Sequence, residues 1–121
     1  PAGPNCNSQN IGLCEEALEQ AALPANIMVD CSHANTEKQP DRQPAVAADV
    51  TEQIIAGNRS IIGLMLESNL KAGNQKIPSN LDDLEYGVSV TDGCIDWDTT
   101  ETLLVDIANK LRSVLPARAT P

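Results

Sequence analysis

The chain has 121 residues, 41% of them hydrophobic, which suits one small domain with a buried core. Aromatic residues make up only 2%, so Leu, Ile, Val and Ala must build that core, and this favours α/β layers over an all-β sandwich. The net charge is −9 and there is no basic cluster, which argues against nucleic-acid or anionic-membrane binding because both need Lys/Arg contacts with phosphate. We expect no membrane span and no secretion, because there is no apolar run of about 18 residues and no signal peptide.

The cysteine content favours a reduced, cytoplasmic setting. None of the four cysteines forms a C-x-x-C pair, and Cys31 lies in an apolar run, as expected of a small buried residue. A disulfide framework is therefore the less favoured interpretation. The chain opens with Pro-Ala-Gly-Pro and no initiator Met, so we expect it to be part of a longer protein.

Apolar residues recur at helical spacing over 9–22 and predict a first helix, which Pro24 stops. Residues 26–31 predict a short apolar strand, and a polar loop follows over 32–43.

A second helix is predicted over 44–56, with Gly57 as its C-terminal cap. Residues 60–66 predict a second strand that is apolar on both faces, which is typical of a parallel strand covered on each side. Residues 68–91 contain turn-forming residues and are predicted to be irregular.

The last helix is the most strongly patterned element. We expect Asp98 to cap it, with Glu101 completing a capping box, and Pro116 to end it. Trp97 is expected in the core, and residues 116–121 are expected to be a disordered tail. The apolar stripe of this helix consists of Leu103, Leu104, Ile107, Leu111 and Leu115.

The order α-β-α-β-loop-α predicts a right-handed unit of two parallel strands joined by a helix. Two strands cannot close a sheet, and each would leave an open edge. The pattern therefore requires further strands from outside these residues.

Three apolar segments each end in a side chain that can bind a metal, namely His33, Glu67 and Asp92. Active sites of parallel α/β proteins gather at the carboxyl ends of the strands. One nitrogen and two carboxylate ligands suit Mn, Fe, Zn or Co. On spacing alone, a metal site is less favoured than a structural role for these residues, because a lone histidine more often serves as a hydrogen-bonding residue. Asp30 could orient a ligand from behind, or cap the following loop.

Other chemistries find little support. There is no Ser-His-Asp or Cys-His arrangement for a covalent nucleophile and no glycine-rich phosphate loop. Lys38 and Arg42 could meet a phosphate near His33, but a solvated loop is the favoured interpretation.

Three ordered segments resemble class I 3-deoxy-7-phosphoheptulonate synthases. They are 28–35 (MVDCSHAN), 63–70 with 73–75 (GLMLESNL, GNQ) and 86–97 (YGVSVTDGCIDW). The resemblance reaches about Leu115. It implies that 1–121 is the C-terminal part of one (β/α)8 TIM-barrel domain, carrying strands seven and eight, and incomplete without the remainder of the barrel.

The implied enzyme is a transferase of aromatic amino-acid biosynthesis. It would condense phosphoenolpyruvate with erythrose 4-phosphate, giving 3-deoxy-D-arabino-heptulosonate 7-phosphate and phosphate in the first step of the shikimate pathway. His33, Glu67 and Asp92 match three of the family's four metal ligands, and the fourth, a cysteine, lies outside these residues. Cys94 matches the family's Thr-Asp-x-Cys run without being that ligand. The complete enzyme is expected to be a cytoplasmic homo-oligomer.

Two alternatives remain open. The 121 residues could be a catalytically inactive truncated fragment or an interaction subunit, which the missing strands favour. Another metal-dependent barrel aldolase is a third hypothesis, against which the combined motifs argue.

Overall fold

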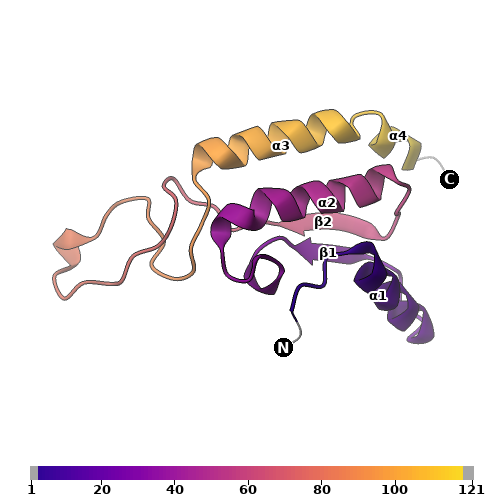
Figure 1. Cartoon of the computed structure of the whole chain (residues 1–121), viewed down its shortest axis with the longest axis horizontal. Coiled ribbons are helices and arrows are strands. Elements are labelled where there is room, and N and C mark those ends of the chain that lie inside the picture. The colour runs from indigo at the N-terminus through magenta and orange to yellow at the C-terminus, as the bar shows by residue number, and fades with distance from the viewer. Residues whose placement is uncertain (1–2, 119–121) are drawn as a thin grey trace.

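The structure is a computed structural model, and it describes residues 3–118. A two-stranded parallel sheet lies at its centre, with helices packed on it (Figure 1). In chain order the elements are α1 (Ser8–Gln20), β1 (Ile27–Asp30), the 3-10 turns η1 (His33–Thr36) and η2 (Pro40–Arg42), α2 (Gln43–Ile55), β2 (Ile61–Met65), the 3-10 turn η3 (Leu81–Asp83), α3 (Trp97–Leu111) and α4 (Val114–Arg118).

Strands β1 and β2 pair in parallel and are joined through α2, which confirms the predicted βαβ unit. Met28 pairs with Gly63 and Asp30 with Met65, with a register irregularity just after Ile27. Their carboxyl ends therefore meet at one edge of the sheet, and the segments that follow both strands start side by side.

Local contacts fix where α1 begins and where α2 ends. Asn7 caps α1 by accepting from the Asn10 N–H at 2.9 Å. Helix α2 is followed by Gly57, whose φ of 110° is a left-handed conformation that glycine adopts without strain. The backbone bond from the Asn58 N–H to the Gln53 carbonyl closes this C-terminal turn.

The last helix differs from the sequence prediction at both ends. Asp96, not Asp98, is its N-cap, and its side chain accepts from the Thr99 N–H at 2.8 Å. Helix α3 ends at Leu111, and Pro116 lies inside the short helix α4 instead of ending the long one. Proline is tolerated there because the first turn of a helix needs no intrahelical N–H donor. Residues 116–118 of the expected tail belong to α4, and its remainder lies outside the described residues.

The core lies between the sheet and helices α2 and α3, which pack on each other. Cys31, Ala47 and Val50 are fully buried in it. The predicted stripe of α3 is only partly confirmed, since Leu103 and Leu111 are buried while other members are exposed. Those exposed members are Leu104 and Leu115.

The expectation that Trp97 belongs to the core is wrong. Its side chain is 52% exposed at the start of α3. It borders an apolar groove that also involves Leu66, Leu70 and Leu104. No other part of the described chain covers this groove, so Trp97 remains in contact with solvent.

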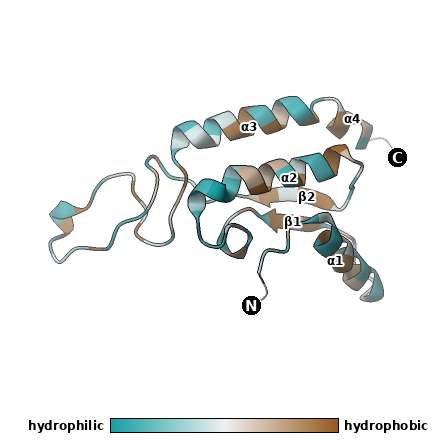
Figure 2. Cartoon of the chain, viewed as in Figure 1, coloured by the Kyte–Doolittle hydropathy of each residue, from teal (hydrophilic) through white to brown (hydrophobic). Residues whose placement is uncertain are grey.

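One face of the sheet is uncovered in the described part of the chain. Val29 points to the buried side, whereas Met28 points the other way and is 66% exposed. Gly63 lies next to Met28 on the partner strand, where an added Cβ would come within 3.0 Å of Met28 Cε. Figure 2 shows brown, hydrophobic colour along both strands. The sequence predicts that the second strand is covered on both faces, but the described residues cover only one face of the sheet.

Residues 68–91 form a long irregular arm that projects away from the layers (Figure 1). The Gln75 side chain donates to the carbonyls of Glu85 and Val88, at 2.8 and 3.0 Å, and so joins the two sides of the arm. Isolated bridges between Ser68 and Ile95 and between Gly73 and Cys94 close its base. The arm therefore returns the chain to the carboxyl end of β2. Among the described residues, no helix is both long and apolar enough to cross a bilayer.

Candidate metal centre

His33 stands three residues beyond the end of β1, and Asp30 fixes its ring. Nδ1 of His33 lies 2.8 Å from Oδ2 of Asp30. The other carboxylate oxygen of Asp30 accepts from the Ser32 N–H at 2.8 Å, so the Asp30 carboxylate also shapes the turn. His33 has a φ of 44°, a left-handed conformation that few residues other than glycine adopt. Both roles considered for Asp30, orienting the ring and capping the loop, are thus combined in one side chain.

Glu67 stands two residues beyond the end of β2. The Ser32 hydroxyl donates to its Oε2 at 2.6 Å. Its other oxygen, Oε1, lies 3.6 Å from Nε2 of His33. One carboxylate oxygen is therefore held from behind while the other faces the imidazole.

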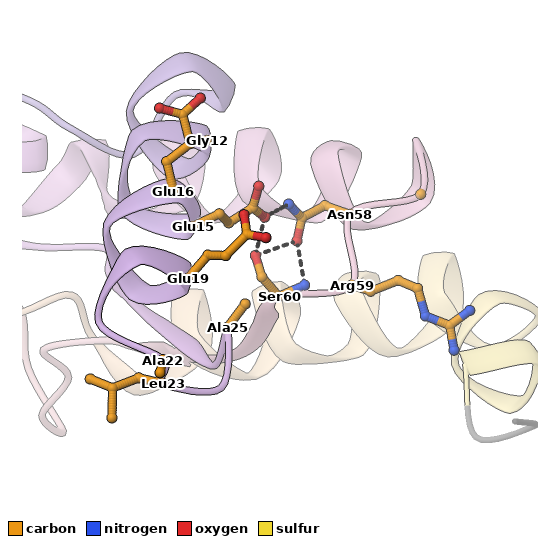
Figure 3. A pocket seen from close by; sticks show the side chains of 11 residues that line it. Gly12, Glu15, Glu16, Glu19, Ala22, Leu23, Ala25, Asn58, Arg59 and Ser60 are labelled. Carbon is orange, nitrogen blue, oxygen red and sulfur yellow. Dashed lines mark hydrogen bonds between the residues drawn. The ribbon is translucent and has the colours of Figure 1, made fainter.

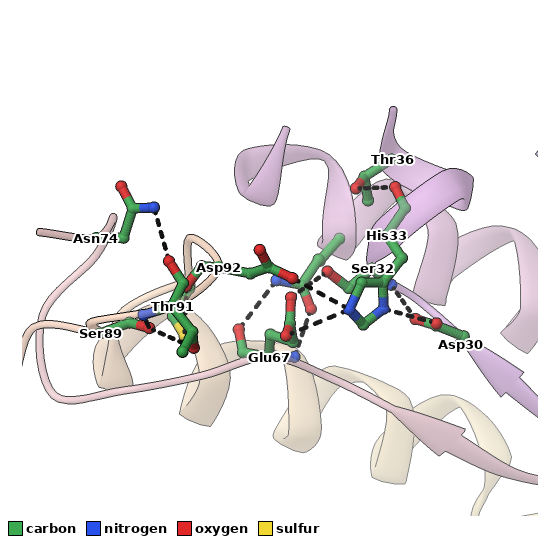
Figure 4. Close-up of polar contacts among 11 residues, drawn as sticks. Asp30, Ser32, His33, Thr36, Glu67, Asn74, Ser89, Thr91 and Asp92 are labelled. Carbon is green, nitrogen blue, oxygen red and sulfur yellow. Dashed lines mark hydrogen bonds and ion pairs between the residues drawn. The ribbon is translucent and has the colours of Figure 1, made fainter. Parts of the chain in front are cut away.

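Asp92 comes from the returning end of the arm. Its Oδ2 lies 3.4 Å from Nε2 of His33. The Ile95 N–H donates to the Glu67 carbonyl at 3.0 Å, which ties the segment after Asp92 to the end of β2. Side-chain atoms of His33, Glu67 and Asp92 that could bind a metal all lie within 4.8 Å of one another (Figure 4).

These separations suit a metal ion. Two ligand atoms bound at about 2.1 Å and at roughly right to tetrahedral angles lie about 3.0–3.4 Å apart. The distances from Nε2 of His33 to the two carboxylate oxygens, 3.4 and 3.6 Å, are close to that range. The hydrogen bond from Nδ1 to Asp30 leaves Nε2 as the free nitrogen, which is how metal-bound imidazoles are commonly held. The donor set of one nitrogen and two oxygens fits a borderline divalent ion.

The three carboxylates around the ring raise the pKa of His33 above 6.5. The hydrogen bond and the charge of Asp30 are the main causes, followed by the charge of Glu67. All three proposed ligands remain in contact with solvent, with side-chain exposures of 46% for His33, 23% for Glu67 and 65% for Asp92. The centre is therefore an open edge that small molecules can reach.

The cysteines near the centre are not part of the cluster. Burial is the main cause that raises the pKa of Cys31 to about 12, so its thiol stays protonated. Burial likewise raises the pKa of Cys94. All four cysteines are free. Arg42, one of the two basic residues near His33, donates to the carboxylate of Glu37 on the exposed surface. This contact fits the solvated loop that the sequence predicts.

Two residues that contact the centre were missed by sequence reasoning. Ser32 falls in the polar loop predicted over 32–43, yet its hydroxyl donates to the carboxylate of Glu67. Gln43 gave no signal, yet its side chain bonds to the backbone of Glu67. Both contacts join segments more than twenty residues apart, so local sequence patterns do not reveal them.

A separate hollow lies between α1 and the turn before β2, near the amino ends of the strands (Figure 3). Glu15, Glu16, Glu19 and Arg59 line it. The Glu15 carboxylate accepts from the Asn58 amide at 2.8 Å and from the Ser60 hydroxyl. Glu15 is thus occupied in holding the turn to α1, and this hollow is remote from His33.

Comparison with known proteins identifies the family. The profile of the DAHP synthetase I family matches residues 2–105. The chain belongs to the DAHP synthetase I family. It is 50% identical over 115 residues to the Tyr-sensitive phospho-2-dehydro-3-deoxyheptonate aldolase of Escherichia coli (strain K12), covering 95% of this chain and 32% of that enzyme.

The similarity extends to eukaryotic relatives and to a solved structure. The tyrosine-inhibited phospho-2-dehydro-3-deoxyheptonate aldolase of Schizosaccharomyces pombe is 41% identical over 114 residues, which are 92% of this chain and 31% of that one. The phospho-2-dehydro-3-deoxyheptonate aldolase of Francisella tularensis SCHU S4 superposes with a TM-score of 0.83 at 41% identity, over 91% of this chain and 31% of that one. The chain thus spans about a third of the length of these family members.

Proposed function

We propose that this chain forms the metal-binding edge of a 3-deoxy-7-phosphoheptulonate synthase, with His33, Glu67 and Asp92 as three of the metal ligands. The observation that carries the proposal is the convergence of these side chains within 4.8 Å, beyond the carboxyl ends of two parallel strands. Membership of the DAHP synthetase I family supports it. The fourth ligand and the groups that hold the substrate phosphates would come from residues outside the 121.

We infer that β1 and β2 are strands seven and eight of a (β/α)8 barrel. The parallel pairing and the crossover through α2 support this placement. The exposure of Met28 supports it as well, since the barrel interior would cover that face. Each strand also has only one partner among the described residues, as expected of a part of a larger sheet.

The proposed reaction joins C3 of phosphoenolpyruvate to the aldehyde carbon of erythrose 4-phosphate, and water adds at C2 as phosphate leaves. A divalent Mn, Fe, Zn or Co ion held at the centre would supply Lewis-acid polarisation of the aldehyde oxygen. Asp30 holds Nδ1 of His33, which directs Nε2 towards the carboxylates. Ser32 holds Oε2 of Glu67, which leaves Oε1 facing the imidazole. These two contacts arrange the ligand atoms before any substrate arrives.

The complete enzyme would act in the cytoplasm as a homo-oligomer, as its resemblance to the family implies. The four free cysteines are compatible with a reducing compartment.

The direct test is to remove ligands in the complete protein that carries these residues. His33→Ala and Glu67→Gln should each lower the affinity for the ion more than about 100-fold, beyond the loss typical of an outer-shell partner, and should abolish synthase activity in parallel. Glu16→Gln, which neutralises a carboxylate in the distant hollow, is the control and should leave both unchanged. Full activity with unchanged metal content in either ligand variant would remove that residue from the centre.

The second candidate function concerns the 121 residues by themselves, which would then be a non-catalytic interaction subunit. The uncovered side of the sheet around Met28 favours it. The chain expressed alone should show no synthase activity, because it supplies only three ligands. Turnover by the purified 121-residue chain would contradict this alternative.

A further inference from the structure

Gln43, the first residue of α2, commits both ends of its side-chain amide to one residue 24 positions later. Its Nε2 donates to the Glu67 carbonyl at 2.9 Å, and its Oε1 accepts from the Glu67 N–H at 2.7 Å. The side chain is completely buried, with 0% exposure. A buried amide is tolerated only where its polar groups find partners, and both partners here belong to Glu67.

This pairing continues the sheet beyond its last residue. Strand β2 ends at Met65, so the backbone of Glu67 lies past the ladder that pairs the two strands. The Gln43 amide offers the same donor and acceptor as a neighbouring peptide group. It therefore fixes the position and orientation of the Glu67 backbone where no strand does so.

The Glu67 carbonyl also joins two parts of the centre. It accepts from the Gln43 amide and from the Ile95 N–H, the latter at 3.0 Å. Ile95 is three residues after Asp92, so the same carbonyl anchors the segment that carries another proposed ligand. A shift of Glu67 would thus move the Asp92 segment as well.

We propose that Gln43 is a positioning residue of the metal centre, which holds the Glu67 backbone so that its carboxylate meets His33. This inference rests on the proposed function of Glu67 as a metal ligand. With the backbone fixed by Gln43 and Oε2 held by Ser32, only Oε1 remains, 3.6 Å from Nε2 of His33. Gln43 itself touches neither the ion nor the substrates.

The simpler interpretation is that Gln43 only fastens α2 to the end of β2. In that case its loss would lower stability and leave the ion, once bound, in the same surroundings. A positioning role predicts a change in the ion's affinity and in its coordination. Co²⁺ serves as the probe because its visible absorption reports the number and arrangement of its ligands.

The experiment compares two glutamines of the same helix in the complete protein. Gln43→Met keeps the approximate volume and removes both hydrogen-bonding groups. It should weaken Co²⁺ binding about 10- to 100-fold, as loss of an outer-shell partner does, and change the spectrum of bound Co²⁺. Gln53→Met is the matched control, because Gln53 donates to the Cys6 carbonyl at 2.8 Å and lies ten residues further along α2. That is about 15 Å from Gln43 along the helix axis, so affinity should stay within about twofold with an unchanged spectrum.

Each outcome decides between the interpretations. Wild-type affinity and spectrum in Gln43→Met would overturn the positioning role. Should that variant fail to fold, Gln43→Asn keeps the amide but is one methylene too short to close both bonds, and wild-type Co²⁺ binding in it would equally overturn the role. His33→Ala is measured in parallel. If His33→Ala retains Co²⁺ binding, the proposed function itself fails; if it loses the ion while the Gln43 variants keep it, only the role of Gln43 fails.

Discussion

Nδ1 of His33 lies 2.8 Å from Oδ2 of Asp30, the last residue of β1, and this contact turns Nε2 towards Glu67 and Asp92. The strand therefore positions the imidazole through its final side chain. Two properties of the centre depend on this pair, the proton affinity of the ring and its orientation.

Asp30→Asn should lower the pKa of His33 towards 6.5, because the charge and the strong acceptor that favour the protonated ring are lost. His33 is the only histidine, so its ring protons can be followed by NMR in the metal-free protein without ambiguity. Glu16→Asn, far from the ring, should leave the pKa unchanged. An unaltered His33 titration in Asp30→Asn would contradict the assigned cause.

Metal affinity should decrease as the pH is lowered through the raised pKa of His33, because a protonated imidazole cannot bind a metal. Since that pKa lies above 6.5, the loss should begin at a higher pH than for an unperturbed histidine. Titration of the complete protein with Co²⁺ between about pH 5 and pH 9 would measure this. In Asp30→Asn the loss should move to lower pH, although the overall affinity should be weaker because the ring is no longer oriented. A Co²⁺ affinity independent of pH across this range would count against His33 as a ligand.

Met28→Ala should destabilise the complete protein by about 2–5 kcal/mol, the cost of truncating a buried methionine, if barrel strands cover the open face. If Met28 instead remains as exposed in the complete protein as it is here, its truncation should cost no more than about 0.5 kcal/mol of stability. Val29→Ala, on the covered face of the same strand, is the positive control. Denaturant unfolding distinguishes the two cases, and a negligible effect of Met28→Ala would argue against placement in a barrel.

Asp96→Ala should lower the thermal unfolding midpoint more than Asp98→Ala, because only Asp96 accepts from the Thr99 N–H at the start of α3. The Thr99 hydrogen bonds hold the pKa of Asp96 below 3.8. The contribution of this carboxylate is therefore present above pH 3.8 and is lost as the pH falls through the lower, folded-state pKa. Equal midpoints for the two variants at neutral pH would contradict the assigned cap.

Local sequence determined most of the secondary structure. Helices predicted over 9–22 and 44–56 appear as Ser8–Gln20 and Gln43–Ile55, and the two strands lie within the predicted ranges. Apolar periodicity and the residues that stop helices act over a few neighbours, so these elements can be read from the chain itself. The α/β class and the parallel pairing followed from the same patterns. Cap assignment was less secure, because Asp96 and Asp98 are chemically identical and only backbone geometry selects between them.

The sequence also singled out His33, Glu67 and Asp92, yet spacing alone could not bring them together. Only the tertiary structure did so, because the parallel register places the ends of β1 and β2 side by side and the arm returns Asp92 to the same edge. The contacts of Gln43 and Ser32 with Glu67 likewise join residues distant in sequence. Element type depends on neighbouring residues, whereas the arrangement of this centre depends on the path of the chain in space.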